Sequence, residues 1–152
     1  MIRLAAAALS LTAICAVAAP ASASTSLERE VLRDINGVRA SHGLGPVRAD
    51  GRLAGGARSY SQSMARHRFF GHGAWYERVR RHTRSRTVGE ILGYVQSVSR
   101  RSEARSIVSA WMNSAGHRAI ILDGRFHRAG VGRGWAHWNG RRTAIYTVDF
   151  AG

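Results

Sequence analysis

The last quarter of the chain carries the pattern that most restricts its fold. Two segments rich in β-branched and aromatic residues, 131–138 and 143–150, flank the dipeptide Asn139-Gly140. Because this dipeptide readily adopts the positive φ angles of a two-residue turn, the segments predict an antiparallel hairpin. The even positions from Ala144 to Phe150 are apolar and the odd positions are mixed. One face of the second strand should therefore pack on a core.

The first half of the chain predicts two amphipathic helices. Thr25 and Glu28 have the spacing of a capping box, and apolar residues then recur at helical intervals until Gly43. A second helix should begin near Asp50 and run toward Phe69. Its apolar face consists of Leu53, Ala57, Tyr60 and Met64.

The middle of the chain is less regular. A short helix is expected over 75–82, and a strand or extended loop over 87–95. Ser102 is expected to cap a further helix that ends around 114–116 and delivers His117 just beyond its end. The inner face of that helix should be Ile107, Val108, Trp111 and Met112. Helices around a small antiparallel sheet indicate an α+β domain.

The first 23 residues predict a secretory signal peptide. Arg3 supplies a short basic start, an apolar run extends to Ala18, and Ala21-Ser22-Ala23 suits signal peptidase. The run is shorter than the roughly 20 residues that span a bilayer, so we expect a secreted protein that is not transmembrane once the signal is removed. Residues 24–152 fit a single domain. Cys15, the only cysteine, leaves with the signal, so packing without disulfides must hold the fold.

The charge balance is strongly basic. The 23 basic residues are all arginine and face nine acidic ones, for a formal net charge of +14. Such an excess favours polyanions, which outside a cell are lipid headgroups, wall polymers or nucleic acid, although a solvated surface explains it equally well. No aromatic residues interleave with the arginines as a base-stacking platform would require, so no specific nucleic-acid ligand is expected. The expected partner is a lipid or a cell-envelope polyanion, and we expect a monomer.

Five motifs in a fixed order resemble the bacterial, extracellular SCP-like branch of the CAP superfamily, which comprises cysteine-rich secretory, antigen 5 and pathogenesis-related proteins. They extend over nearly all of the predicted domain and occupy residues 35–73, 88–93, 108–122, 129–134 and 146–150. The resemblance implies a three-layer α/β/α sandwich with a small, mainly antiparallel sheet. This architecture agrees with the predicted helices and hairpin.

The resemblance also implies a site. In family members with a complete site, two histidines and two acidic residues meet in a cleft and can hold a divalent metal. His72 matches the histidine of the Phe-x-His motif, Glu90 the glutamate of the Gly-Glu-Asn motif, and His117 the histidine before the arginine in 108–122. These three are the candidate cleft residues and metal ligands. Imidazole and carboxylate suit zinc, and Glu90 is the candidate catalytic base.

Three positions depart from the family pattern. Ser114 stands where many eukaryotic relatives place the fourth ligand, a glutamate. Ile91 and Ile120 replace asparagines that follow the Gly-Glu and His-Arg-Ala segments. Losing two amides should make the cleft drier, which favours an apolar ligand over hydrolysis.

Three functions remain open at this point. The first is a secreted binding module for an apolar, lipid-like or cell-envelope ligand. The second is a metal-dependent, peptidase-like hydrolase in which a metal-bound water attacks and Glu90 is the base. The third is an envelope scaffold without a small ligand. Alternatively, Glu90 only hydrogen-bonds one histidine and holds the loops together, since a buried carboxylate needs a partner.

Other candidate residues receive simpler interpretations. Trp111 is expected in the core, and Asp149 occupies a strand position from which it could point toward the cleft. Trp135 and Trp138 either form an exposed aromatic patch or cover the sheet. The remaining histidines are expected at the surface: His42, His67, His82, His127 and His137.

Overall fold

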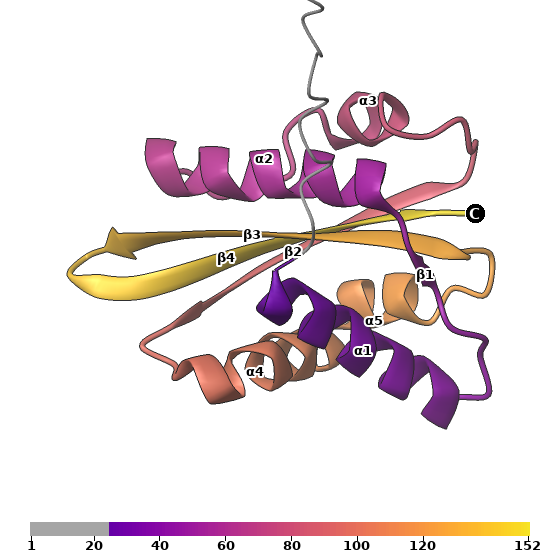
Figure 1. Cartoon of the computed structure of the whole chain (residues 1–152), viewed down its shortest axis with the longest axis horizontal. Coiled ribbons are helices and arrows are strands. Elements are labelled where there is room, and N and C mark those ends of the chain that lie inside the picture. Colours follow the sequence, from indigo (N-terminus) through magenta and orange to yellow (C-terminus); the bar gives the residue numbers. More distant parts are fainter. Residues whose placement is uncertain (1–24) are drawn as a thin grey trace, which may run out of the picture.

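A computed structural model describes residues 25–152, in which helices cover both faces of a four-stranded sheet (Figure 1). The strand order is β1-β3-β4-β2. β1 (Arg48–Ala49) pairs in parallel with β3 (Arg128–Trp138), and β4 (Arg141–Ala151) lies antiparallel to both β3 and β2 (Val88–Gln96). The predicted α+β sandwich with a mainly antiparallel sheet is confirmed. The signal peptide predicted over residues 1–23, with Cys15, lies outside the described residues.

The helices divide between the two faces of the sheet. α2 (Gly51–His67) and α3 (Trp75–Arg80) lie on one face. α1 (Ser26–Ser41), α4 (Arg100–Met112) and α5 (Ala115–Ile121) lie on the other (Figure 1). Within residues 25–152, none of these helices combines the length and the apolar character that crossing a bilayer requires.

Both predicted helix starts in the first half are confirmed. The Glu28 amide donates to the Thr25 hydroxyl over 3.3 Å, and the Thr25 amide donates back to the Glu28 carboxylate over 2.6 Å. Asp50 caps α2 by accepting from the amides of Arg52 and Leu53. The turn at Asn139-Gly140, with φ angles of 50° and 73°, forms the predicted hairpin.

Two predictions in the middle of the chain are wrong. α4 begins after Ser99, whose backbone is extended, and Ser102 lies in the first helical turn, where its hydroxyl contacts Ser99. Both serines suit a helix start, so residue type alone does not choose between them. The chain then turns at Ser114 into α5, which was not predicted, so that His117 lies inside a helix instead of beyond one.

Glycines let α2 lie directly on the sheet. Gly130, Gly132 and Gly134 occupy alternate positions on β3, on the face toward α2. A Cβ atom on each would lie 2.0, 2.0 and 2.3 Å from main-chain atoms of α2, far inside van der Waals contact. The two backbones therefore touch with no side chain of β3 between them.

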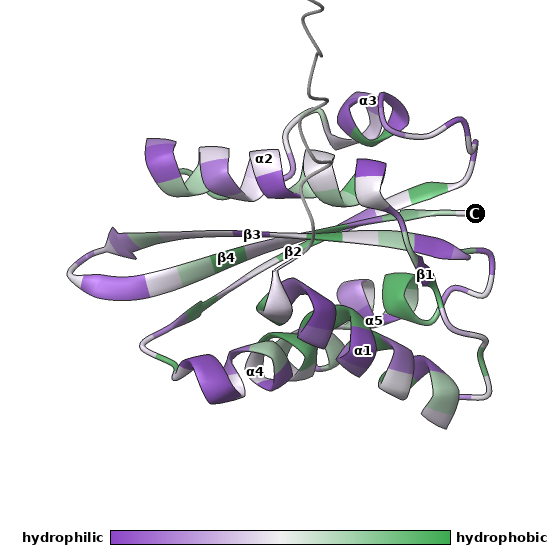
Figure 2. Ribbon diagram, in the orientation of Figure 1, coloured by the Kyte–Doolittle hydropathy of each residue, from purple (hydrophilic) through white to green (hydrophobic). Residues whose placement is uncertain are grey.

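The main core lies on the opposite face of the sheet, under α1, α4 and α5. Hydrophobic residues of these helices and of the strands form one core cluster, and the green segments of Figure 2 mark such residues in α4 and α5. Trp111 is 1% exposed, and its indole N–H donates to the carbonyl of Leu92 over 2.8 Å, so its predicted place in the core is confirmed. Because α2 covers the other face, the odd positions of β4 are as buried as the even ones.

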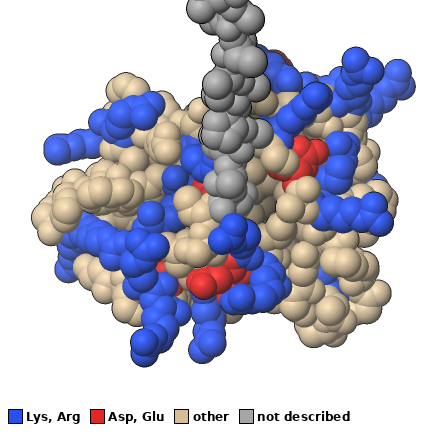
Figure 3. Space-filling model, viewed as in Figure 1, with Lys and Arg blue, Asp and Glu red and all other residues tan. Residues whose placement is uncertain are grey.

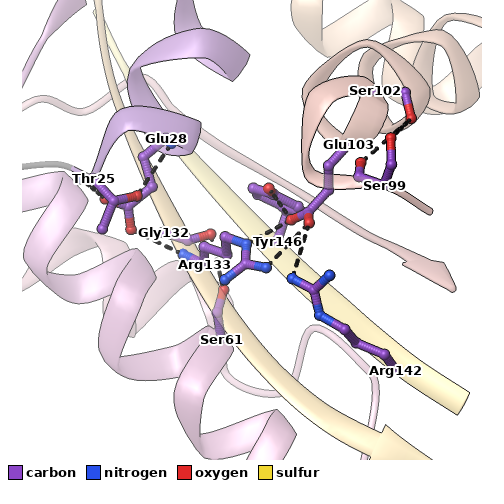
Figure 4. Close-up of polar contacts among 10 residues, drawn as sticks. All are labelled: Thr25, Glu28, Ser61, Ser99, Ser102, Glu103, Gly132, Arg133, Arg142 and Tyr146. Atoms are coloured by element: carbon purple, nitrogen blue, oxygen red, sulfur yellow. Dashed lines mark hydrogen bonds and ion pairs between the residues drawn. The ribbon is translucent and has the colours of Figure 1, made fainter. Parts of the chain in front are cut away.

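A buried polar network connects α1 and α4 to β3 (Figure 4). Glu28 of α1 accepts the main-chain N–H of Arg133 over 3.1 Å. Glu103 of α4 accepts from the Arg133 guanidinium over 2.6 Å and from the Tyr146 hydroxyl over 2.6 Å. Burial and the charge of Glu103 raise the pKa of Tyr146, so its hydroxyl stays a donor.

Two further arginines, the half-buried Arg58 and the buried Arg39, connect segments that are distant in sequence. Arg58 of α2 forms a two-pronged ion pair with Glu28, at 2.9 and 2.7 Å, which joins helices from opposite faces of the sheet. Arg39 donates to the carbonyls of Gly45, Ile121, Asp123 and Phe126. Arginine cross-links thus hold the fold together with apolar packing. The sequence analysis predicted the packing but not the cross-links.

Candidate functional site

A cleft of about 640 Å³ opens beside the first residues of β2, one of the two edge strands of the sheet, and is bordered by residues of α3 and α5. All three predicted site residues line it. Its polar and charged residues are His72, Glu90, Ser114, His117, Asp123 and Arg125, the last two paired with each other. Its apolar lining includes Trp75, Val88, Ala119, Ile120 and Phe126.

Glu90 is held from two sides at the bottom of this arrangement. Its buried carboxylate accepts from Nδ1 of His72 over 2.8 Å and from the guanidinium of Arg78. The Arg78 guanidinium carbon also lies 3.4 Å from the centre of the Tyr60 ring, a cation–π contact. Tyr60 in turn donates to the carbonyl of Gly71 over 2.6 Å, which fixes the loop before His72. The sequence patterns place Arg78 only within the short helix expected over 75–82 and give it no role in the site.

Asp149 of β4 lies beside Glu90 on the neighbouring strand. The two residues are register partners in the β2–β4 ladder, and Asp149 is 0% exposed. Neither carboxylate oxygen has a hydrogen-bond partner among the described residues. Burial, reinforced by the charge of Glu90, raises the pKa of Asp149 well above its usual value.

His117 reaches the cleft from α5, whereas His72 lies in the loop between α2 and α3. Burial, and then the nearby His72, lower the pKa of His117. Its imidazole is therefore neutral at neutral pH and can both donate and accept a hydrogen bond. His72, by contrast, has a half-exposed side chain with one ring nitrogen already engaged by Glu90.

The two isoleucines that depart from the family pattern lie in different places. Ile120 lines the cleft, as expected. Ile91 is 0% exposed and packs in the main core, because alternation along β2 turns it away from the face that carries Glu90. Ile120 lies where the prediction of a drier cleft requires it. Ile91 does not line the cleft, so the prediction is wrong for that residue.

Residues 32–150 match the cysteine-rich secretory protein family, known as CAP. The chain belongs to the CAP family. It is 34% identical over 120 residues to YkwD, an uncharacterized protein of Bacillus subtilis, across 75% of this chain and 44% of YkwD. The chain spans less than half the length of the curated relatives it matches.

Two solved structures show the same CAP fold. An extracellular protein containing an SCP domain, from Bacillus anthracis, superposes with a TM-score of 0.64 at 23% identity, over 82% of this chain and 40% of the other. An outer surface protein of Borrelia burgdorferi superposes with a TM-score of 0.64 at 18% identity, over 82% and 91%. At these identities the likeness concerns the fold alone.

The donor set of this CAP domain does not fit a metal ion as it is arranged. Within residues 25–152, no three His, Cys, Asp or Glu side chains are grouped closely enough to hold one. Both oxygens of Glu90 are engaged, one by a histidine and one by the cationic Arg78, and Ser114 occupies the fourth family position. The metal-ligand assignment of His72, Glu90 and His117 stays a prediction.

Ser61 and the histidines outside the cleft are structural or surface residues of the CAP domain. The hydroxyl of Ser61 is buried and donates to Gly132 and Thr147. His82 is half-buried, with its ring packed where a side chain at Gly56 would lie, so it is less exposed than expected. Four of the five other histidines are exposed as predicted: His42, His67, His127 and His137.

The CAP domain has a second groove of about 530 Å³ between α1 and α4. Val38, Val108 and Met112 form its apolar part, and Arg33 and Arg105 are among its polar residues. It lies apart from the cleft and shares no lining residue with it.

Proposed function

We propose that this CAP domain is a secreted binding module whose cleft holds a small apolar or lipid-like molecule. One observation carries the proposal: the cleft has a largely apolar lining, and its carboxylates, Glu90 and Asp123, are each already paired with a basic side chain. Glu90 faces both His72 and Arg78, so its charge is compensated before any ligand arrives. The neutral imidazole of His117 can then orient one polar end of the ligand.

The apolar lining provides the binding energy in this proposal. Burying apolar surface is worth roughly 25 cal/mol per Å², which favours a hydrocarbon chain or ring over a water-filled cleft. Ile120 lies within this lining, at a position where the family pattern has asparagine. Secretion, which the signal-like N-terminus predicts, would bring the domain to lipids and other envelope molecules.

A fluorescent fatty acid, cis-parinaric acid, tests the proposal directly. The wild-type protein should bind the probe, and Ile120→Asn, which restores the family's polar residue, should weaken binding by about tenfold. Met112→Asn is the matched control, because it makes a similar change in the groove between α1 and α4. Loss of binding only in the control would place the ligand outside the cleft, and no binding by the wild type would overturn the proposal.

The second candidate is the metal-dependent hydrolase, and one observation favours it: His72 and His117 line the same cleft. Calorimetric titration with zinc, alongside His72→Ala, separates the two functions. Stoichiometric binding tighter than about micromolar that the variant loses would establish the metal site. Absent or unchanged binding would exclude the hydrolase and leave the binding module.

A further inference from the structure

Aromatic and basic residues from three distant segments meet at one end of the sheet, which we call the hairpin end. It comprises residues 66–70, which include the end of α2 and the loop after it, residues 94–101, which lead from β2 into α4, and residues 135–142 around the β3–β4 turn. In Figure 1 this end lies at the left, where the hairpin projects beyond the helices.

Backbone contacts bring these segments together. α2 lies along β3 so that Gly134 sits against the main chain of Ser61, near the C-terminal half of the helix. The end of α2 therefore approaches the hairpin turn. The amide of Ser97, just after β2, donates to the carbonyl of Arg142 over 2.9 Å, which fixes the β2–α4 connection beside the start of β4.

The hairpin end exposes large aromatic side chains. The Phe70 ring meets Tyr94 edge-on at 5.2 Å between centroids, and Tyr94 lies 6.1 Å from Trp138. Phe69, Phe70 and Tyr94 are 40%, 44% and 47% exposed, and Trp135, which alternation along β3 turns to the opposite face of the sheet, is 58% exposed. Isolated exposed rings are ordinary, but a group of them marks a binding surface.

The charge of the hairpin end has one sign. Its three segments contain six arginines and no acidic residue. Among the ion pairs formed within residues 25–152, these arginines have one acidic partner, Glu103, which lies 3.7 Å from Arg142. Figure 3 shows blue side chains around this left margin of the molecule. The arginines are Arg66, Arg68, Arg100, Arg101, Arg141 and Arg142.

We propose that the hairpin end docks on an anionic lipid bilayer. Aromatic rings favour the headgroup region, where they bury an apolar body, while arginines bind lipid phosphates. Single-stranded nucleic acid fits less well, because Phe70 and Tyr94 pack edge-to-face and do not offer a row of free ring faces for bases. The cleft begins near Val88, toward the other end of β2, so docking leaves it accessible.

Among the polyanions that the net charge favours, this inference selects anionic lipid. It does not depend on what the cleft binds. Its test uses sedimentation of the purified protein with vesicles of phosphatidylcholine alone, or of phosphatidylcholine and phosphatidylglycerol in equal parts. We expect binding to the anionic vesicles only, weakening as salt is added. Binding that is equal for both vesicle types, or absent from both, would overturn the proposal.

Paired variants locate the surface. Arg100→Gln with Arg101→Gln should weaken binding roughly tenfold to thirtyfold. Arg84→Gln with Arg86→Gln removes the same charge from exposed positions between α3 and β2 and should change binding less than threefold. Phe70→Ser should weaken binding, whereas Tyr76→Ser, at an equally exposed ring on α3, should not. Circular dichroism confirms that each variant is folded, and equal losses in test and control variants would contradict a hairpin-end site.

Discussion

Asp149 of β4 lies directly opposite Glu90 of β2, and both carboxyl groups are withdrawn from solvent on the same face of the sheet. Glu90 has Arg78 and His72 to balance its charge, whereas Asp149 has no hydrogen-bond partner among the residues described. Two carboxylates this close do not both ionise readily. Asp149 therefore keeps its proton to a higher pH than an ordinary aspartate.

This relationship predicts how stability depends on pH. In the unfolded chain the Asp149 carboxyl returns to an ordinary pKa of about 3.9, so the folded state binds the proton more tightly. The stability that this proton contributes is fully present below the unfolded pKa and is lost as pH rises through the raised folded pKa. The Asn side chain of Asp149→Asn cannot ionise. The free energy of unfolding of this variant should therefore not fall in this way as pH rises.

Urea unfolding of wild type and Asp149→Asn at intervals between about pH 4 and pH 8 measures the effect. The control is Asp34→Asn on α1, which changes the same residue type at a partly exposed position. It should keep the wild-type pH dependence. Parallel curves for wild type and Asp149→Asn would show that Asp149 ionises normally.

The close approach of α2 to β3 predicts a large effect of one methyl group. Gly132→Ala places a Cβ 2.0 Å from the main-chain nitrogen of Arg58, so α2 must move away from the sheet. We expect a loss of about 3 kcal/mol or more in the free energy of unfolding. Gly37→Ala, on the exposed face of α1 where the new Cβ meets nothing within 4 Å, should instead stabilise by about 0.5–1 kcal/mol. Chemical denaturation distinguishes the opposite signs.

The Glu103 network predicts a penalty for an unpaired buried charge. Glu103→Ala removes the acceptor of both the Arg133 guanidinium and the Tyr146 hydroxyl, and should cost about 3–5 kcal/mol. Adding Arg133→Met should restore much of this loss, because it removes the stranded cation. Glu77→Ala, at an exposed position on α3, should change stability by less than about 0.5 kcal/mol. Thermal melts of the four proteins test the series, and a double variant no better than Glu103→Ala would contradict it.

The hydrogen bonds of Arg39 predict that lysine cannot replace arginine at this buried position. Its three nitrogen groups donate to four carbonyls in a fixed, fork-like geometry. An ammonium group is a compact donor that cannot span those carbonyls, so Arg39→Lys should cost about 2 kcal/mol or more. Arg29→Lys, at an exposed position on α1, is the matched control. Urea midpoints that shift equally in both variants would contradict a special role for Arg39.

Sequence patterns predicted the regular parts of the fold because those parts depend on neighbours in the chain. The capping box at Thr25, the cap at Asp50 and the turn at Asn139-Gly140 each depend on a few adjacent residues. The break at Ser114 and the helix that carries His117 depend instead on packing against the sheet, which no local pattern encodes.

The candidate site was predicted only in part, because sequence motifs identify residues but not the contacts that form between distant segments. The family motifs identified His72, Glu90 and His117, and all three line the cleft. They did not identify Arg78, whose role comes from stacking on Tyr60 and reaching Glu90 across the site. Strand alternation could have shown that Ile91 faces away from Glu90, and the register of β2 with β4 then places Asp149 beside it.

The arginine cross-links have a consequence for the conditions in which the domain can fold. The described residues contain no cysteine, and the long-range ties run through Arg39, Arg58 and Arg133. A reductant has no bond to cleave in such a fold, and no oxidoreductase is needed to form one. The domain should reach the same native state under reducing conditions as under oxidising ones, and its stability should not depend on redox potential.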